Sequence, residues 1–140
     1  MRKSFTMLEL IFVIVVIGIL AGVAIPRLFS GISDAEIAKV KTDVATIRTA
    51  ISTKYGKNVM EGNDSCPSLE TSTTDNQLFE GILTYPIKQN TGTVKWDGNG
   101  TDYNVTIDQK VIKFHYYNDT ANNCKFVCDN TNGNCSLIGE

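Results

Sequence analysis

The chain has 140 residues, of which 42% are hydrophobic and 20% are charged, and its formal net charge at pH 7 is −2. This length suffices for one domain with a small core and excludes a second large domain. Lys and Arg outnumber Asp and Glu by seven to four up to Gly56, whereas from Lys57 onward they are outnumbered six to eleven. The acidic C-terminal part argues against a broad phosphate-binding surface, so nucleic acid is not an expected partner.

The first predicted element is an apolar helix over residues 5–25, FTMLELIFVIVVIGILAGVAI, preceded by Met1-Arg2-Lys3-Ser4. A helix of this length rises about 31 Å, which matches the hydrocarbon core of a bilayer. Glu9 is the one carboxylate in the stretch. Because inserting a carboxylate into a membrane span costs roughly a few kcal/mol, Glu9 requires a partner. The basic residues before the span predict a cytoplasmic N-terminus and an exported C-terminal part.

This segment resembles the N-terminus of type IV pilins and of type II secretion pseudopilins, and the resemblance extends to about Tyr55. The matching features are the basic Arg2-Lys3, the start Phe5-Thr6, Glu9 four residues after Phe5, the apolar run and Pro26 at its end. Ser4 stands where the family usually has Gly. The resemblance implies cleavage between Ser4 and Phe5 by a membrane prepilin peptidase, and then methylation of the Phe5 amine. It also implies an inner-membrane assembly platform and other pilins or pseudopilins as partners.

Cleavage would place the cationic Phe5 amine one helical turn from Glu9. The resemblance implies that Glu9 of an incoming subunit pairs with the Phe5 amine of a neighbour and thereby sets the axial register. Gly18 and Gly22, with two nearby alanines, would allow helices to approach closely in lipid or in a fibre, although ordinary membrane helices share this composition. Two alternatives remain: Glu9 lies at the headgroup boundary, or the segment is a secretory signal peptide cleaved after Ala24.

A second helical stretch is predicted over residues 32–56, after a kink at Pro26 and a loosened segment at Ser30-Gly31. Ser33 and Glu36 have capping-box spacing, and Gly56 is the predicted stop. Apolar residues at spacings of three and four form one stripe: Ile37, Val40, Val44, Ile47, Ile51 and Tyr55. Charges recur too often for a second membrane span, so this stripe must cover a sheet.

The remaining chain predicts a connecting loop over 57–92, with a possible helical turn at 78–83, and a three-stranded antiparallel meander over 93–117. Asp97-Gly98-Asn99-Gly100 is a hairpin signal, and apolar residues alternate on the strands after it. The resulting architecture is an α+β, pilin-like fold. It has a leader at 1–4, a transmembrane and assembly helix at 5–31, and a periplasmic domain at 32–140 that ends in a cysteine-rich region, 118–140.

All four cysteines lie in the exported part: Cys66, Cys124, Cys128 and Cys135. An even count in an oxidising compartment indicates disulfides, and C-x3-C-x6-C is not a typical zinc spacing. The turn-rich stretch between Cys128 and Cys135 favours that pair, which leaves Cys66–Cys124; four cysteines nevertheless allow three pairings.

Two kinds of surface site are suggested by short motifs. Asn63, Asn99 and Asn104 each stand in D/E-x-N-x-S/T, the acidic sequon that some bacterial oligosaccharyltransferases prefer, although Asn, Asp and Gly also simply make turns. Asp97-x-Asn99-x-Thr101 imitates the start of a calcium loop but has Asp102 where Gly is needed. Asp119 and Asp129 are further oxygen donors, so calcium is a weak candidate and no other cofactor is expected.

No catalytic motif is present: His115, the one histidine, has no Ser, Cys or carboxylate placed beside it by a motif. We therefore expect a non-enzymatic, single-pass protein of the bacterial inner membrane that polymerises through its N-terminal helix. The resemblance favours a homo-oligomeric filament subunit, most specifically a type II secretion pseudopilin, in contact with membrane lipid before assembly. The alternative is a minor pilin or a membrane-anchored binding module that captures a ligand, DNA or a surface.

Overall fold

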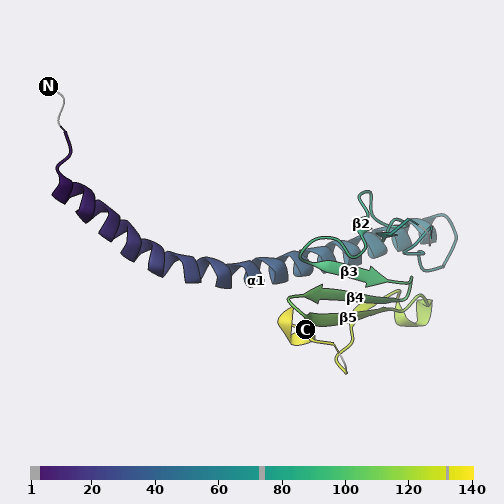
Figure 1. Ribbon diagram of the computed structural model, residues 1–140. Helices are drawn as coiled ribbons and strands as arrows, with labels where there is room; N and C mark the ends of the chain where they lie inside the picture. Colours follow the sequence, from purple (N-terminus) through teal and green to yellow (C-terminus); the bar gives the residue numbers. More distant parts are fainter. Residues whose placement is uncertain (1–3, 73–74, 132) are drawn as a thin grey trace. The chain divides into compact units, whose positions relative to one another are not determined.

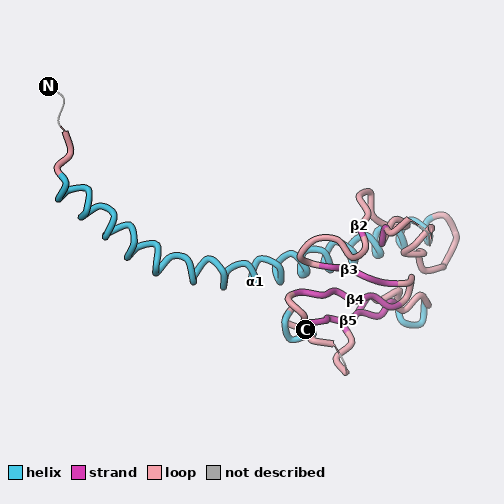
Figure 2. The backbone as a smooth tube through the Cα atoms, in the orientation of Figure 1, coloured by secondary structure: helices cyan, strands magenta, loops and turns pink. Residues whose placement is uncertain are grey.

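A computed structural model describes residues 4–72, 75–131 and 133–140, and within its helix the side chains of 25–33 are not described. The chain forms one long α-helix followed by two small antiparallel sheets (Figures 1 and 2). It divides into two compact units, Met1–Ala35 and Glu36–Glu140. We call the second unit the head. The predicted kink at Pro26, loosening at Ser30-Gly31 and cap at Ser33 fall in the stretch whose side chains are not described, and they stay predictions.

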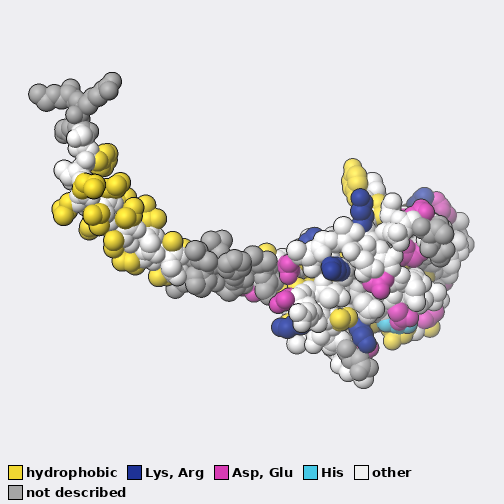
Figure 3. Space-filling model, in the orientation of Figure 1, with side chains coloured by type: hydrophobic (Ala, Val, Ile, Leu, Met, Phe, Trp, Pro, Cys, Tyr) yellow, Lys and Arg dark blue, Asp and Glu magenta, His cyan; other side chains and the backbone are white. Residues whose placement is uncertain are grey.

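Helix α1 spans Met7–Met60 and begins two residues later than predicted. Thr6 is its N-cap, because the Thr6 Oγ1 accepts a hydrogen bond from the Glu9 backbone N–H at 3.3 Å. The apolar side chains that follow are exposed in the single chain and colour the N-terminal part of Figure 3. Met7–Ala24 has a mean hydropathy of 2.8 and is 0% buried, so α1 is long and apolar enough there to cross a membrane.

The C-terminal end of α1 lies at Met60, so the predicted stop at Gly56 is wrong. A glycine inside a helix weakens it but does not end it unless it adopts a left-handed conformation. Gly62 has that conformation, with φ of 80°. The Asn63 N–H donates to the Asn58 carbonyl at 2.9 Å and the Gly62 N–H to the Val59 carbonyl at 3.0 Å. These two bonds are the Schellman motif that closes many helices.

The main sheet has the antiparallel order β3-β4-β5-β6. Its strands are β3 (Lys95–Gly98), β4 (Asp102–Ile107), β5 (Lys110–Tyr116) and β6 (Phe126–Cys128). The three predicted strands are present, and the hairpin turn follows Gly98. The sequence did not indicate β6, because three residues are too few to show an alternating pattern.

The predicted loop over 57–92 contains more order than expected. It holds the last turn of α1 and a two-stranded sheet of β1 (Gln77–Leu78) and β2 (Ile87–Lys88). The possible helical turn at 78–83 is confirmed only after β1, where the Leu83 N–H donates to the Phe79 carbonyl at 2.8 Å. Leu69, Leu78 and Phe79 are buried in the core, so this segment is part of the fold rather than an exposed connection.

The core lies between the C-terminal half of α1 and the main sheet. The predicted stripe supplies Val40, Val44, Ile47 and Ile51, each no more than 4% exposed, while Ile37 and Tyr55 pack at its margins. Opposite them is an aromatic cluster of Phe79, Trp96, Tyr103, Phe114 and Phe126. This packing confirms the α+β architecture, a helix with one apolar face laid on an antiparallel sheet.

Two disulfides join the chain in the pairing that the turn-rich stretch favours. Cys66–Cys124 spans 58 residues and Cys128–Cys135 spans seven, with Cα–Cα distances of 5.5 and 5.9 Å. The first ties the loop after α1 to the segment before β6. The second closes the C-terminal turn, where the Gly133 N–H donates to the Asp129 carbonyl at 2.8 Å. On the loop-entropy model they stabilise the fold by about 4 and about 2.5 kcal/mol.

Candidate functional site

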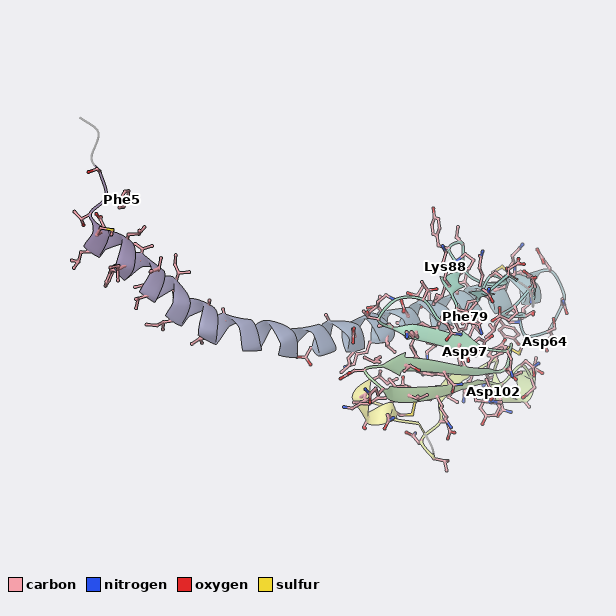
Figure 4. All side chains as sticks on the ribbon, viewed as in Figure 1. Phe5, Asp64, Phe79, Lys88, Asp97 and Asp102 are labelled. Atoms are coloured by element: carbon pink, nitrogen blue, oxygen red, sulfur yellow. A yellow bond between two sulfur atoms is a disulfide. The ribbon has the colours of Figure 1, made fainter. Side chains whose placement is uncertain are left out.

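The first candidate site is the N-terminal segment, which we define as residues 4–24. Ser4, Phe5 and Thr6 precede α1 in non-helical backbone, and all three are exposed. Figure 4 shows Phe5 at the start of the helix, where its side chain is 76% exposed. The Ser4–Phe5 peptide bond therefore lies in exposed backbone outside α1.

Glu9 lies in the first turn of α1, four residues after Phe5. Its carboxylate is near the helix N-terminus, where unpaired backbone N–H groups favour a negative charge. The surface around it is mostly apolar and is formed by Leu8, Ile11, Phe12 and Val15, together with Thr6. The segment therefore has one carboxylate, that of Glu9, on a mostly apolar surface. It lies one helical turn from Phe5, whose backbone nitrogen would become an N-terminal ammonium group after cleavage.

Gly18 and Gly22 lie on the exposed part of the same helix. A Cβ atom built on either glycine would meet no atom of the described chain within 4 Å. Neither glycine is therefore required by packing inside one molecule, and both leave room for an external surface to approach the backbone. Pro26, the remaining predicted assembly residue, lies outside the residues whose side chains are described.

The head carries a pair that sequence reasoning missed. His115 on β5 lies directly opposite Asp102 on β4, and the His115 Nδ1 is 2.7 Å from the Asp102 Oδ1. This hydrogen bond holds the pKa of the Asp102 carboxyl below its usual value. No sequence motif places a carboxylate beside His115. The register of the β4–β5 hairpin does so, because it pairs His115 with Asp102. The ring of Tyr117 packs edge-on against His115, and the Thr101 hydroxyl donates to the Asp102 Oδ2 at 3.2 Å.

The three sequon asparagines occupy different environments. Asn63 follows the helix cap and Asn99 lies in the turn between β3 and β4, and both are exposed. Asn104 is half-buried in the middle of β4, where it faces Asp97 on one neighbouring strand and Lys113 on the other. The structure therefore places the Asn63 and Asn99 side chains in loops and the Asn104 side chain in a strand that is paired on both sides.

The four calcium candidates are not gathered into one site. Asp97 accepts a hydrogen bond from Gln89, and the Asn99 Oδ1 accepts one from the Asp102 N–H. Asp119 caps a short 3-10 helix, Thr120–Asn122, whose Asn122 bonds hold the pKa of Asp119 below its usual value. Asp129 accepts from the Thr131 N–H at 2.8 Å. Across the described ranges no three His, Cys, Asp or Glu side chains converge as metal ligands, and calcium binding stays a prediction.

The chain is similar to curated fimbrial proteins. It is 37% identical over 67 residues to a Type IV major fimbrial protein FimA of Dichelobacter nodosus, covering 44% of this chain and 43% of that protein. Another FimA of that species is 29% identical over 102 residues, 62% of this chain and 64% of the relative. The Type IV major alpha-pilin of Moraxella bovis is 34% identical over 77 residues, with coverages of 55% and 46%.

The chain thus spans less than two thirds of the length of each of these curated relatives. No family model matches the chain, and no solved structure matches it.

Proposed function

Because this chain is related to the type IV pilins, we propose that it is a structural subunit of a type IV pilus-like filament, polymerised through its N-terminal helix. The observation that carries the proposal is the helical segment Met7–Ala24. It is apolar throughout apart from Glu9 and is 0% buried by its own chain. Surface of this kind has to be covered by lipid or by protein. A filament subunit uses both covers in turn, lipid before assembly and neighbouring helices after it.

Processing is the first step of the proposed pathway. A prepilin peptidase hydrolyses the Ser4–Phe5 bond, and the new Phe5 amine is then methylated. Support comes from the exposed, non-helical backbone of residues 4–6 and from the basic residues before it. Ser4 in place of Gly adds only a hydroxymethyl group next to the bond that is cut. We expect such a small side chain to be accommodated.

Glu9 provides the proposed register. Moving a carboxylate into an apolar helical bundle is unfavourable unless a cation accompanies it, and removing either partner then leaves an uncompensated charge. Pairing Glu9 with the Phe5 amine of a neighbouring subunit neutralises both groups. Because any other axial offset separates them, the pair selects one register. Gly18 and Gly22 support the same arrangement by leaving the helix surface open.

Before assembly, we propose that the chain is a single-pass protein of the bacterial inner membrane, with residues 1–4 cytoplasmic and the head periplasmic. The basic Arg2-Lys3 supports this orientation, and two disulfides in the head suit an oxidising compartment. The curated relatives reported above are named as fimbrial proteins or pilins, which favours a pilus over a type II secretion pseudopilus.

The test is assembly of the full chain in a host that has a prepilin peptidase and an assembly platform. Filaments are sheared from cells, pelleted and imaged by electron microscopy, and the N-terminal peptide is identified by mass spectrometry. We expect a peptide beginning at methylated Phe5, and we expect Glu9→Ala to abolish filaments while the protein remains in the membrane.

Glu36→Ala is the matched control, because it removes a carboxylate from the same helix outside the apolar segment. It should assemble normally. A mature chain beginning at Ile25 would instead identify a secretory signal peptide. Filaments formed equally well by Glu9→Ala would remove Glu9 from the mechanism.

A further inference from the structure

We propose that the head is a substrate for N-linked glycosylation at Asn63 and Asn99, and that the third acidic sequon, at Asn104, is protected by the fold. The saccharide donor is an oligosaccharide linked to a lipid diphosphate. The asparagine Nδ2 attacks the anomeric carbon, the bond from that carbon to the diphosphate oxygen breaks, and Nδ2 loses a proton. The lipid diphosphate is the leaving group.

The sequence contains three D/E-x-N-x-S/T segments: Glu61–Ser65, Asp97–Thr101 and Asp102–Thr106. By composition roughly 0.2 are expected by chance, so the number alone is a modest signal. What distinguishes them is the structural cost of presenting each segment to an enzyme. An oligosaccharyltransferase must draw five consecutive residues into its active site, so any core side chain or paired strand within them has to be pulled out first.

The segment at Asn63 has a low cost. All five of its residues are exposed, and it contains the Gly62 cap of α1 and the three residues that follow it. The carboxamide nitrogen of Asn63, the atom that would be glycosylated, makes no hydrogen bond within the described part of the chain. Figure 4 labels the neighbouring Asp64 at the end of the head where α1 stops.

The segment at Asn99 is similar. Its last three residues form the β3–β4 turn, whereas Asp97 and Gly98 end β3 and pair with Asn104 and Tyr103 of β4. None of its five side chains is buried, so presenting it opens only the end of the β3–β4 ladder and removes no core side chain. The Asn99 Oδ1 accepts the Asp102 N–H at 3.2 Å, so the carbonyl side of the amide is bound and its nitrogen is free of hydrogen bonds among the described residues. Asp97, the acidic residue two positions before it, is exposed. Figure 4 labels Asp102, directly after this turn, toward the same end of the head as Asp64.

The segment at Asn104 differs in being paired along its length on both sides and in carrying core side chains. It coincides with β4, which is paired with β3 on one side and β5 on the other. It also contains Tyr103 and Val105, both 0% exposed in the core. Presenting it requires opening two ladders and removing two core side chains, which amounts to unfolding the head. The same motif therefore has opposite consequences in a loop and in a central strand.

The test is intact-mass measurement and glycopeptide mapping of the full-length protein purified from the membranes of its source organism. We expect two glycan masses per chain, one on the Asn63 peptide and one on the Asn99 peptide. Asn63→Gln and Asn99→Gln should each remove one glycan mass. Asn104→Gln is the matched control and should leave the glycan mass unchanged.

Two further observations separate this chemistry from general modification of exposed asparagines. Asp97→Asn should remove the glycan from Asn99 and leave the one on Asn63, because only the acidic position changes. Asn118, exposed and followed by Asp119-Thr120 but preceded by Tyr116 at the acidic position, should carry none. The mass of the bare disulfide-bonded chain, or a glycan on Asn104 with Asn63 and Asn99 unmodified, would overturn the proposal. Neither result depends on whether the chain forms filaments.

Discussion

The β4–β5 turn contains two residues in a conformation that L-amino acids rarely adopt. Asp108 and Gln109 have φ of 43° and 66° and connect Ile107 to Lys110 as a two-residue hairpin loop. Positive φ at both positions is the type I′ pattern, in which glycine is preferred at the second. The sequence places Gln there, so the turn carries avoidable strain.

Gln109→Gly should therefore stabilise the head by about 0.5–1 kcal/mol. The measurement is urea unfolding of the detergent-solubilised chain with its disulfides intact, followed through the fluorescence of Trp96, which is the one tryptophan and is fully buried. Lys110→Gly, one residue later in β5, serves as control and should destabilise. Equal effects of the two substitutions would show that the turn is not strained.

Arg48 on α1 binds the C-terminal residue of the chain. Its guanidinium donates to both carboxylate oxygens of Glu140, and its Nε donates to the Phe126 carbonyl at 2.9 Å. The bond from Arg48 holds the pKa of the Glu140 carboxyl below its usual value. Because the folded pKa is lowered, the stabilisation is present above the unfolded pKa of about 4.5 and is lost as the pH falls through the folded pKa.

Glu140→Gln should accordingly lower the free energy of unfolding at pH 7 by about 0.2–1 kcal/mol, the range for a partly exposed ion pair. Below the folded pKa the variant and the parent should converge. Unfolding curves at pH 7, 5 and 3 check this. A difference that stays constant down to pH 3 would mean that Glu140 acts through packing rather than through its charge.

At the scale of elements, the sequence predicts those with a repeating apolar pattern. It does not predict short strands, or elements that depend on pairing with distant parts of the chain. The stripe from Val40 to Ile51 repeats often enough to fix both the helix and its buried face. A glycine directly after an apolar stripe predicts a helix end, which the sequence offers at Gly56. The helix instead ends before Gly62, the glycine that has the left-handed φ. Strands β1, β2 and β6 have two or three residues each, and tertiary pairing creates them.

The candidate site shows the same division. Phe5, Glu9 and the sequons are local motifs and were visible in the sequence. The Asp102–His115 pair was not, since it depends on a hairpin register set by a two-residue turn. Nor could the sequence show that Asn104 is enclosed by strands while Asn99 is not.

The two disulfides should differ in their contribution, because they close loops of very different length. Replacing Cys66 and Cys124 together by Ser should cost about 4 kcal/mol, and replacing Cys128 and Cys135 about 2.5 kcal/mol. Urea unfolding of the two double variants, with the parent as reference, gives both values. A larger loss for the Cys128–Cys135 pair would indicate that the C-terminal turn contributes packing beyond loop closure.

For the whole molecule, the exposed glycines of the N-terminal segment allow filament assembly to be tested without changing the stability of the head. If neighbouring helices approach at Gly18 and Gly22, a leucine at either position should clash at a cost of about 1–3 kcal/mol, or roughly fivefold to 150-fold in the assembly equilibrium and hence a lower filament yield. The unfolding of the head, followed through Trp96, should not change. Leu20→Ile, which keeps the volume at an exposed position between them, is the control, and sheared filament yield is the measurement.

Among the residues whose side chains are described, the buried core of the head begins at Val40, and Ile37 packs against it. Substitutions in residues 4–24 and substitutions in the head core are expected to be energetically additive, because the side chains of 4–24 are exposed and those of the core are buried. If the chain assembles as proposed, additivity has an evolutionary consequence. The surface of the head can change by substitution without altering the segment through which neighbouring subunits would contact one another.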